Sequence, residues 1–305
     1  IQPLNFSGLL KVSSAIDGDI INYGVPRYRK LNSKHFKVVH TSANDDQIHL
    51  EAQTLSSQVD VAIDVFHHTS EVSDKKANNG PKTTAFQMER ELSQDEVFEL
   101  ERSIFIETSR NRLDDKVQKQ ALRYHQIRSD SAAQWNDIWK NIDIKISGDR
   151  YSQELIRLQL YHLICSASPL NTEFDAGMTA RGLHGEAYRG HIFWDELFIL
   201  PFYFKHFPEV ARSLMMYRYR RLDAARANAR KNDRKGALIP WQIADTGEEE
   251  TQEIHYNPMS GDWDPDLSRK QRHVSIAVAF NIINYYHHTK EEDFLANEGG
   301  EMLLE

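Results

Sequence analysis

A glycine-punctuated loop runs directly into the most aromatic segment of the chain in the sequence Gly182-Leu183-His184-Gly185-Glu186-Ala187-Tyr188-Arg189-Gly190-His191-Ile192-Phe193-Trp194-Asp195-Glu196. Seven of the sixteen residues from Ile192 to Phe207 are aromatic, against 10% of the whole chain. Residues 192–206 are apolar nearly all round, which predicts a buried helix. This segment therefore indicates the core of a helical domain, with polar side chains at its entrance.

Helical patterns continue on both sides of this segment. Further helices are expected over Ser152–Ser166 and Pro208–Asn232, from the capping box Ser268-Arg269-Lys270-Gln271, and from the capping box Thr289-Lys290-Glu291-Glu292. The last of them still continues at Glu305, and no strands are expected between these helices. The connection over residues 237–267 is longer than a simple link between two helices needs to be, and loops of this length usually carry functional residues.

The first part of the chain alternates instead between apolar and polar residues. Strands are expected at residues 36–40, 48–52, 59–65, 98–102 and 104–106, and turns at residues 44–46 and 75–81. This alternation predicts a sheet with one wet face, and so part of an all-β sandwich.

The segment Leu113–Asn141 has no glycine or proline and carries Trp135 and Trp139 on one helical face. It predicts a linking helix that docks on the second domain through this aromatic pair. A ligand platform is the alternative. The expected domains are residues 1–112 for the sandwich, 113–147 for the linker and 148–305 for the helical domain.

Composition excludes several classes of protein. The chain has 305 residues and a net charge of −8, from 37 basic and 45 acidic residues, so nucleic acid is not an expected partner. No run approaches eighteen apolar residues, and a membrane partner is not expected either. The single cysteine, Cys165, cannot form an internal disulfide. The sequence has no H-E-x-x-H or Cys/His metal spacing, and no metal is expected.

Two aromatic–carboxylate clusters are candidates for chemistry. Trp194 with Asp195 suits a sugar, because an indole face covers the apolar side of a pyranose and a carboxylate accepts its hydroxyls. A core tryptophan and a helix cap explain the same pair equally well. The second cluster is Pro240-Trp241-Gln242 with the acidic run Gly247–Glu250 and, further on, Trp263-Asp264. That acidic run is expected to be a solvated face, although the loop could line a polar cleft.

The stretch Ala180–Asp195 closely resembles the signature of glycoside hydrolase family 65. Other matching segments are Ser7-Gly8, Asp17-Gly18-Asp19, Trp135 and Trp139, Pro240-Trp241-Gln242, Gln271-Arg272-His273-Val274 and Tyr285-Tyr286. The family usually has glutamate where Gln242 stands. It includes maltose, trehalose and kojibiose phosphorylases and related α-glucoside hydrolases.

The resemblance implies a multidomain β + α chain: part of an N-terminal β-sandwich, a helical linker and the first half of an (α/α)6 barrel. It also implies inverting cleavage of an α-linked glucose disaccharide, such as trehalose, maltose or kojibiose, by phosphorolysis or hydrolysis. The family's general-acid glutamate is expected beyond Glu305, so no catalytic residue is assigned in this chain, and we expect the sequence to be the central portion of a longer protein.

The resemblance further implies a substrate-binding role for a set of residues that comprises Phe193, Trp194, Asp195, Trp241, Gln242, His184, Tyr188 and His191. No cofactor is expected, and inorganic phosphate would be the co-substrate of a phosphorylase. A homo-oligomer in the cytoplasm is expected. The competing interpretation is a non-catalytic carbohydrate-binding or protein-interaction scaffold.

Overall fold

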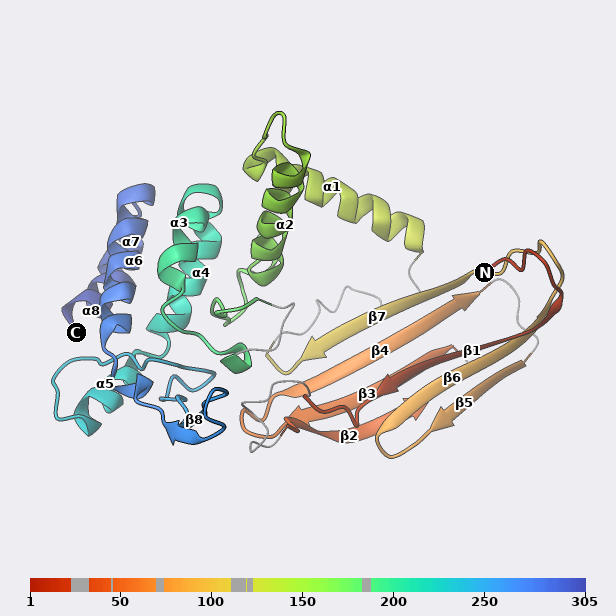
Figure 1. Cartoon of the computed structure of the whole chain (residues 1–305), viewed down its shortest axis with the longest axis horizontal. Helices are drawn as coiled ribbons and strands as arrows, with labels where there is room; N and C mark the ends of the chain where they lie inside the picture. The colour runs from red at the N-terminus through yellow and green to blue at the C-terminus, as the bar shows by residue number, and fades with distance from the viewer. Residues whose placement is uncertain (23–32, 45, 70–73, 111–118, 120–122, 183–187) are drawn as a thin grey trace. The chain divides into compact units, whose positions relative to one another are not determined.

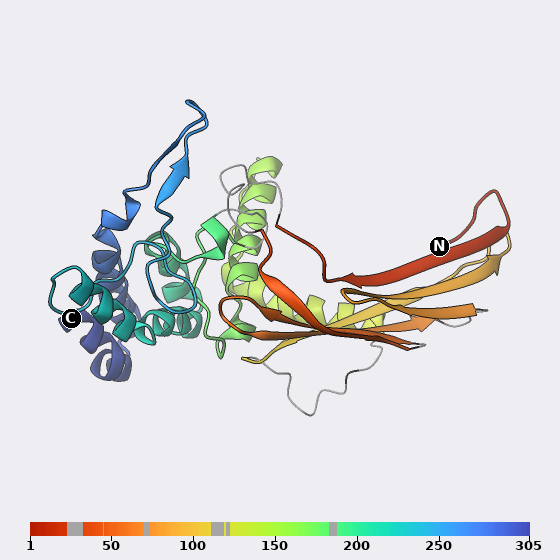
Figure 2. The same ribbon diagram turned by 90° about the horizontal axis from the view of Figure 1, so that it is seen from below.

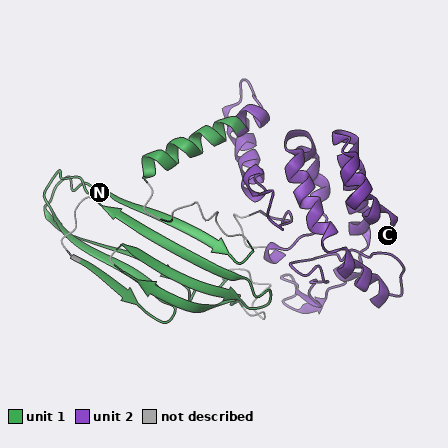
Figure 3. Cartoon of the chain, turned by 180° about the vertical axis from the view of Figure 1, so that it is seen from behind, with its two compact units in different colours: residues 1–23, 31–137 green, residues 24–30, 138–305 purple. Residues whose placement is uncertain are grey.

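The computed structural model describes residues 1–305 except 23–32, 45, 70–73, 111–118, 120–122 and 183–187. The chain divides into two compact units, one built from residues 1–23 and 31–137 and the other chiefly from residues 138–305 (Figure 3). The division falls inside helix α1 (Tyr124–Ile142). That helix covers the later part of the linking helix expected over residues 113–141, whose residues 113–118 and 120–122 lie outside the described part of the chain.

The first unit is a β-sandwich of two antiparallel sheets (Figure 1). One sheet has the order β1-β6-β5, with strands β1 (Gly8–Asp17), β6 (Thr83–Leu92) and β5 (Asp74–Asn79). The other has the order β2-β3-β4-β7, with strands β2 (Phe36–Ala43), β3 (Gln47–Thr54), β4 (Asp60–Thr69) and β7 (Leu100–Thr108). Ile48, Leu50 and Val65 of the second sheet share one buried cluster with Phe86 and Met88 of the first. The two sheets therefore pack face to face, as the alternating pattern predicted.

Three strands of this first unit were not predicted. Residues 75–81 were expected as a turn, yet most of them belong to β5, which pairs along β6 from Asp74 with Glu89 to Asn79 with Thr84. A polar edge strand needs only backbone pairing on one side, and so leaves no apolar alternation to detect. The strands β1 and β6 were also missed, and the two short strands expected at 98–106 are one strand, β7.

The second unit is mainly helical. Its helices are α2 (Arg150–Ser166), α3 (Glu196–His206), α4 (Pro208–Tyr219), α5 (Leu222–Lys231), α6 (His273–Thr289), α7 (Glu292–Phe294) and α8 (Gly300–Leu304). The last two flank a π-helical turn over Leu295–Gly299. Helices α3 and α6 lie side by side (Figure 1), and their buried residues include Leu200, Tyr203 and Phe204 of α3 with Ile282 and Tyr285 of α6.

Four features of this unit differ from the prediction. Helix α3 starts at Glu196 rather than Ile192, because the backbone of Ile192 is hydrogen-bonded to Ile243 instead. The helix expected over 208–232 is interrupted between α4 and α5, where a side-chain nitrogen of Arg221 donates to the Tyr217 carbonyl. The backbone N–H of Arg221 bonds to Arg218 instead. Residues 254–256 and 263–265 form strands β8 (Ile254–Tyr256) and β9 (Trp263–Pro265), although no strands were expected there.

The expected capping box at Ser268 also does not open a helix. A 3₁₀ turn (Ser268–Lys270) occupies its place, and α6 begins at His273. The carboxylate of Asp266 accepts the backbone N–H of Ser268, the first residue of this turn, at 2.9 Å. The β8–β9 hairpin extends away from the helices of this unit (Figure 2).

Candidate functional site

A left-handed turn begins the candidate site. Tyr188, Arg189 and Gly190 have φ angles of 52°, 57° and 68°. A non-glycine residue in this region costs about 1–3 kcal/mol, and such strain concentrates at functional sites. A guanidinium nitrogen of Arg189 donates to the carbonyl oxygen of Glu250 at 2.7 Å, which ties the turn to the 240–250 loop.

A short antiparallel bridge then joins the two signature segments. The backbone N–H of Ile192 donates to the Ile243 carbonyl at 2.9 Å, and the reverse bond measures 3.0 Å. Both side chains are buried in a small cluster with Tyr217. The segments around Phe193 and Trp241, which are far apart in the sequence, therefore lie next to each other.

Phe193 is the packing centre of this region. Its side chain is 2% exposed, and its ring meets the rings of Trp241 and Tyr188 edge to face, with centroids 4.8 and 5.0 Å away. Such aromatic pairs contribute about 0.5–1.5 kcal/mol beyond the area that they bury. The side chain of Phe193 therefore holds the two segments together, and its burial leaves little of it to touch a ligand.

Gln242 and His191 form a hydrogen-bonded pair across the bridge. The Gln242 side-chain nitrogen lies 2.7 Å from Nδ1 of His191, and Gln242 is 6% exposed. Burial, together with the positive charge of Arg189, lowers the pKa of His191 to about 4. The imidazole is therefore neutral at physiological pH, and a neutral ring can accept a hydrogen bond from the Gln242 amide at Nδ1.

Trp194 and Asp195 follow Phe193 directly at the start of α3. Asp195 precedes the first residue of the helix, but its side chain makes no capping bond. Nor does it hydrogen-bond to another residue in the described part of the chain. Burial raises the pKa of this half-buried carboxyl. A desolvated carboxyl whose hydrogen-bond partner among the described residues is only its own backbone N–H is a group to which ligand hydroxyls could donate.

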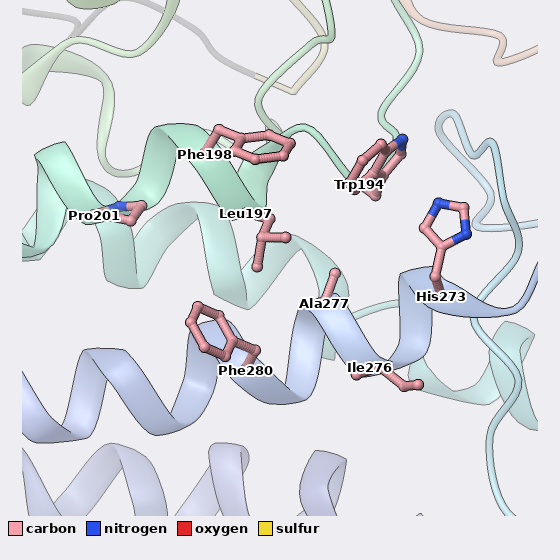
Figure 4. A pocket seen from close by; sticks show the side chains of 8 residues that line it. All are labelled: Trp194, Leu197, Phe198, Pro201, His273, Ile276, Ala277 and Phe280. Atoms are coloured by element: carbon pink, nitrogen blue, oxygen red, sulfur yellow. The ribbon is translucent and has the colours of Figure 1, made fainter.

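Trp194 lines an apolar groove between α3 and α6 (Figure 4). The groove encloses about 760 Å³ and is lined by Trp194, Leu197, Phe198, Pro201, His273, Ile276, Ala277 and Phe280. The rings of Trp194 and His273 meet edge to face at 4.8 Å. Phe198 and Ile276 remain 68% and 72% exposed. This lining suits apolar side chains rather than a sugar.

The acidic run Gly247–Glu250, which was expected to be a solvated face, includes one carboxylate that binds backbone N–H groups. Glu249 accepts the backbone N–H groups of Trp241, Gln242 and Thr251 at 3.1, 3.3 and 3.2 Å. The Thr251 hydroxyl also donates to it. Its carboxylate thus fixes the backbone under the proline–tryptophan segment, a role that acidic composition alone could not indicate.

The structure brings most of the predicted site residues together. Tyr188, His191, Phe193, Trp241 and Gln242 form one cluster, and Trp194 and Asp195 continue from it along the chain. His184 lies outside the described residues. Sequence reasoning placed Glu249 in an acidic run but missed its support of the Trp241–Gln242 backbone, because no recognisable motif carries that role.

Comparison with known proteins identifies the family. The family profiles of glycosyl hydrolase family 65 match the chain as the N-terminal domain over residues 1–141 and the central catalytic domain over residues 157–305. The chain belongs to glycosyl hydrolase family 65. Trehalose 6-phosphate phosphorylase from Lactococcus lactis subsp. lactis is 34% identical over 99% of the chain and 40% of its own length. Kojibiose phosphorylase from Thermoanaerobacter brockii is 32% identical over 100% of the chain and 41% of its own length.

The family assignment extends to the fold. A solved chain from the human microbiome, named for kojibiose phosphorylase, superimposes with a TM-score of 0.78 at 22% identity. The superposition covers 98% of the 305-residue chain and 38% of the solved chain. The chain thus spans about two-fifths of the length of these relatives.

Two further features of this family 65 chain concern metal binding and membrane spans. Among the described residues, no group of three or more histidine, cysteine, aspartate or glutamate side chains is arranged to hold a metal ion. In the same part of the chain, every helix is too short or too polar to cross a bilayer.

Proposed function

We propose that this chain forms the sugar-binding wall of an enzyme that cleaves an α-linked glucose disaccharide with inversion at the anomeric carbon. The family assignment and the likeness to disaccharide phosphorylases support this proposal. In such a reaction an acid protonates the glycosidic oxygen while phosphate, or an activated water, attacks from the opposite face.

The observation that carries the proposal is the placement of Trp194 and Asp195. The carboxyl of Asp195 is half-buried, and it has no hydrogen-bond partner elsewhere in the described residues. A helix cap would bond the backbone of the first turn, as Asp149 does on the N–H of Ser152 before α2. In our proposal, Asp195 accepts two vicinal hydroxyls of the glucose whose bond is cleaved, and Trp194 covers the ring.

The acid that protonates the leaving oxygen is proposed to lie beyond the residues of this chain. The relatives are about two and a half times as long as the part that matches, which supports a catalytic site completed by a longer polypeptide. The helices α2 to α8 would then be the first half of an (α/α)6 barrel. The apolar groove between α3 and α6 would be covered by helices that follow in that polypeptide.

Substrate choice is proposed to reside in the loop of residues 246–266, which includes the β8–β9 hairpin. Tyr256 and Trp263 face each other across this hairpin, with ring centroids 5.6 Å apart. An aromatic pair on a projecting hairpin suits the second sugar of the disaccharide. Trehalose, maltose and kojibiose are the candidate substrates, and the name of the Lactococcus relative adds trehalose 6-phosphate.

The product tests the reaction class. The complete polypeptide is incubated with each disaccharide, with and without inorganic phosphate, and the anomeric proton of the new product is followed by NMR. Phosphorolysis with inversion gives β-glucose 1-phosphate only when phosphate is present, and hydrolysis gives β-glucose in either case. Formation of α-glucose 1-phosphate, hydrolysis of trehalose that gives α-glucose alone before mutarotation, or no cleavage of any α-glucoside would refute the proposal.

A further inference from the structure

A buried ion pair lies against the segment that carries Trp194 and Asp195. Glu196, the first residue of α3, faces Arg218 near the end of α4, and Nε of the guanidinium is 3.0 Å from a carboxylate oxygen. Their side chains are only 4% and 2% exposed. Burial raises the pKa of the Glu196 carboxyl, while the charge of Arg218 opposes this shift.

The same guanidinium also holds the backbone just before the pair of candidate residues. Its Nη2 donates to the carbonyl oxygen of Phe193 at 2.5 Å. Phe193 directly precedes Trp194, and Glu196 directly follows Asp195. Arg218 therefore contacts the chain on both sides of this dipeptide, where a small displacement would move both ligand-binding side chains.

Stability alone does not account for this arrangement. A buried ion pair loses about as much in desolvation as it gains by attraction, and well-packed apolar residues often replace it without loss. Nη1 of Arg218 is buried with no hydrogen-bond partner among the described residues, and beyond the guanidinium the Glu196 carboxylate has only a weak contact with the backbone N–H of Met178. What apolar residues could not supply is a donor for the Phe193 carbonyl.

We propose that Arg218 and Glu196 are positioning residues that hold Trp194 and Asp195 in the geometry that binds the sugar. Glu196 orients the guanidinium, and the guanidinium fixes the peptide after Phe193. This inference rests on the proposed function, because it assigns the support of the same site.

The test is a pair of replacements in the complete polypeptide. The double variant Glu196→Leu/Arg218→Met removes both charges at similar volume, and should remain folded, because removing two buried charges offsets the loss of the bond to the Phe193 carbonyl. Its kcat/KM on the α-glucoside should still fall about ten- to hundredfold, since misplacing a binding group by about 1 Å has effects of this size. Both a higher KM and a lower kcat are expected.

Two further variants keep the result interpretable. Arg218→Lys retains the charge without the planar fork that reaches two acceptors, and should lower kcat/KM at nearly unchanged melting temperature. The matched control is Asp143→Leu/Arg157→Met, which removes a two-bond ion pair of 2.9 and 2.7 Å on the surface, and should leave kcat/KM unchanged.

The outcomes separate the two proposals. A folded double variant with wild-type kcat/KM overturns the positioning role, and if that variant does not fold, wild-type kinetics of Arg218→Lys would do so. Asp195→Asn is measured in parallel. If Asp195→Asn is itself fully active, the sugar-binding assignment fails; if only Asp195→Asn loses activity, the positioning role alone fails.

Discussion

Replacing Asp195 by asparagine should make the protein less active without making it less stable. The amide keeps the shape of the side chain but is uncharged and has a donating NH2 group in place of one of the two acceptor oxygens of the carboxylate. A hydrogen bond to a charged group contributes about 1.5–3 kcal/mol, so losing one lowers kcat/KM by roughly ten- to hundredfold. The loss should appear with every α-glucoside tested, because the glucose of the cleaved bond is common to all.

The stability of the same variant follows from the raised pKa of Asp195. Because burial penalises the ionised form in the folded state, the native protein holds a proton on Asp195 more tightly than the unfolded chain does. The contribution of the Asp195 carboxyl to the free energy of unfolding is therefore most favourable at low pH, and it is lost as the pH rises through the pKa of the folded state. At pH 7 Asp195→Asn should melt at or above the wild-type temperature, and this advantage should shrink as the pH falls.

The assay measures melting temperature and kcat/KM on the same preparation of the complete polypeptide, between pH 4 and pH 8. Asp149→Ala is the control, because Asp149 caps α2 through bonds to the backbone and hydroxyl of Ser152. It should lose about 1 kcal/mol of stability and no activity. An Asp195→Asn protein that is fully active but less stable would refute the sugar-binding role and leave Asp195 as a cap.

Three other predictions concern the activity of the isolated chain, the apolar groove and the buried His191. The 305-residue chain made alone should not cleave maltose, trehalose, kojibiose or nigerose, because a general acid contributes on the order of 10²–10⁴-fold; robust turnover by the purified chain would place the acid within it. Phe280→Asp places a charge in the apolar groove and should reduce the binding of a hydrophobic dye by the isolated chain, whereas Ile254→Asp, outside the groove, should not. If both variants changed dye binding equally, the groove would not be the exposed apolar surface that binds the dye. The free energy of unfolding should fall as the pH drops from about 6.5 to about 4, since unfolding lets His191 take up a proton. His191→Asn should weaken this pH dependence more than exposed His287→Asn does, and identical slopes in urea titrations at each pH would contradict the burial of a neutral imidazole.

The fold was predictable where side-chain pattern reports burial. In β3, Ile48, Leu50 and Ala52 alternate with polar residues and all three are buried. β5 was missed because Lys75, Lys76 and Asn78 sit on an edge strand where backbone bonds suffice. The start of α3 was misplaced for a related reason. The partner of Ile192 is Ile243, 51 residues away, and periodicity in one segment cannot reveal such a bond.

The candidate site divides in the same way. Trp194, Asp195 and the Pro240-Trp241-Gln242 segment stand out from the sequence, because aromatic and polar residues are juxtaposed there. Their support does not stand out. In the sequence, Glu249 looks like one more acidic surface residue, and Arg218 like one of several arginines in α4 and α5. Only the folded structure shows that Glu249 accepts backbone N–H groups of the second segment and that Arg218 donates to the backbone carbonyl of Phe193.

The most direct test of the sugar-binding wall is a structure of the complete polypeptide with a bound α-glucoside. We expect both oxygens of the Asp195 carboxylate to lie within hydrogen-bond distance of vicinal hydroxyls on the glucose of the cleaved bond, with the Trp194 ring over its apolar face. A sugar bound elsewhere, with the Asp195 carboxylate turned toward the backbone of α3, would contradict it.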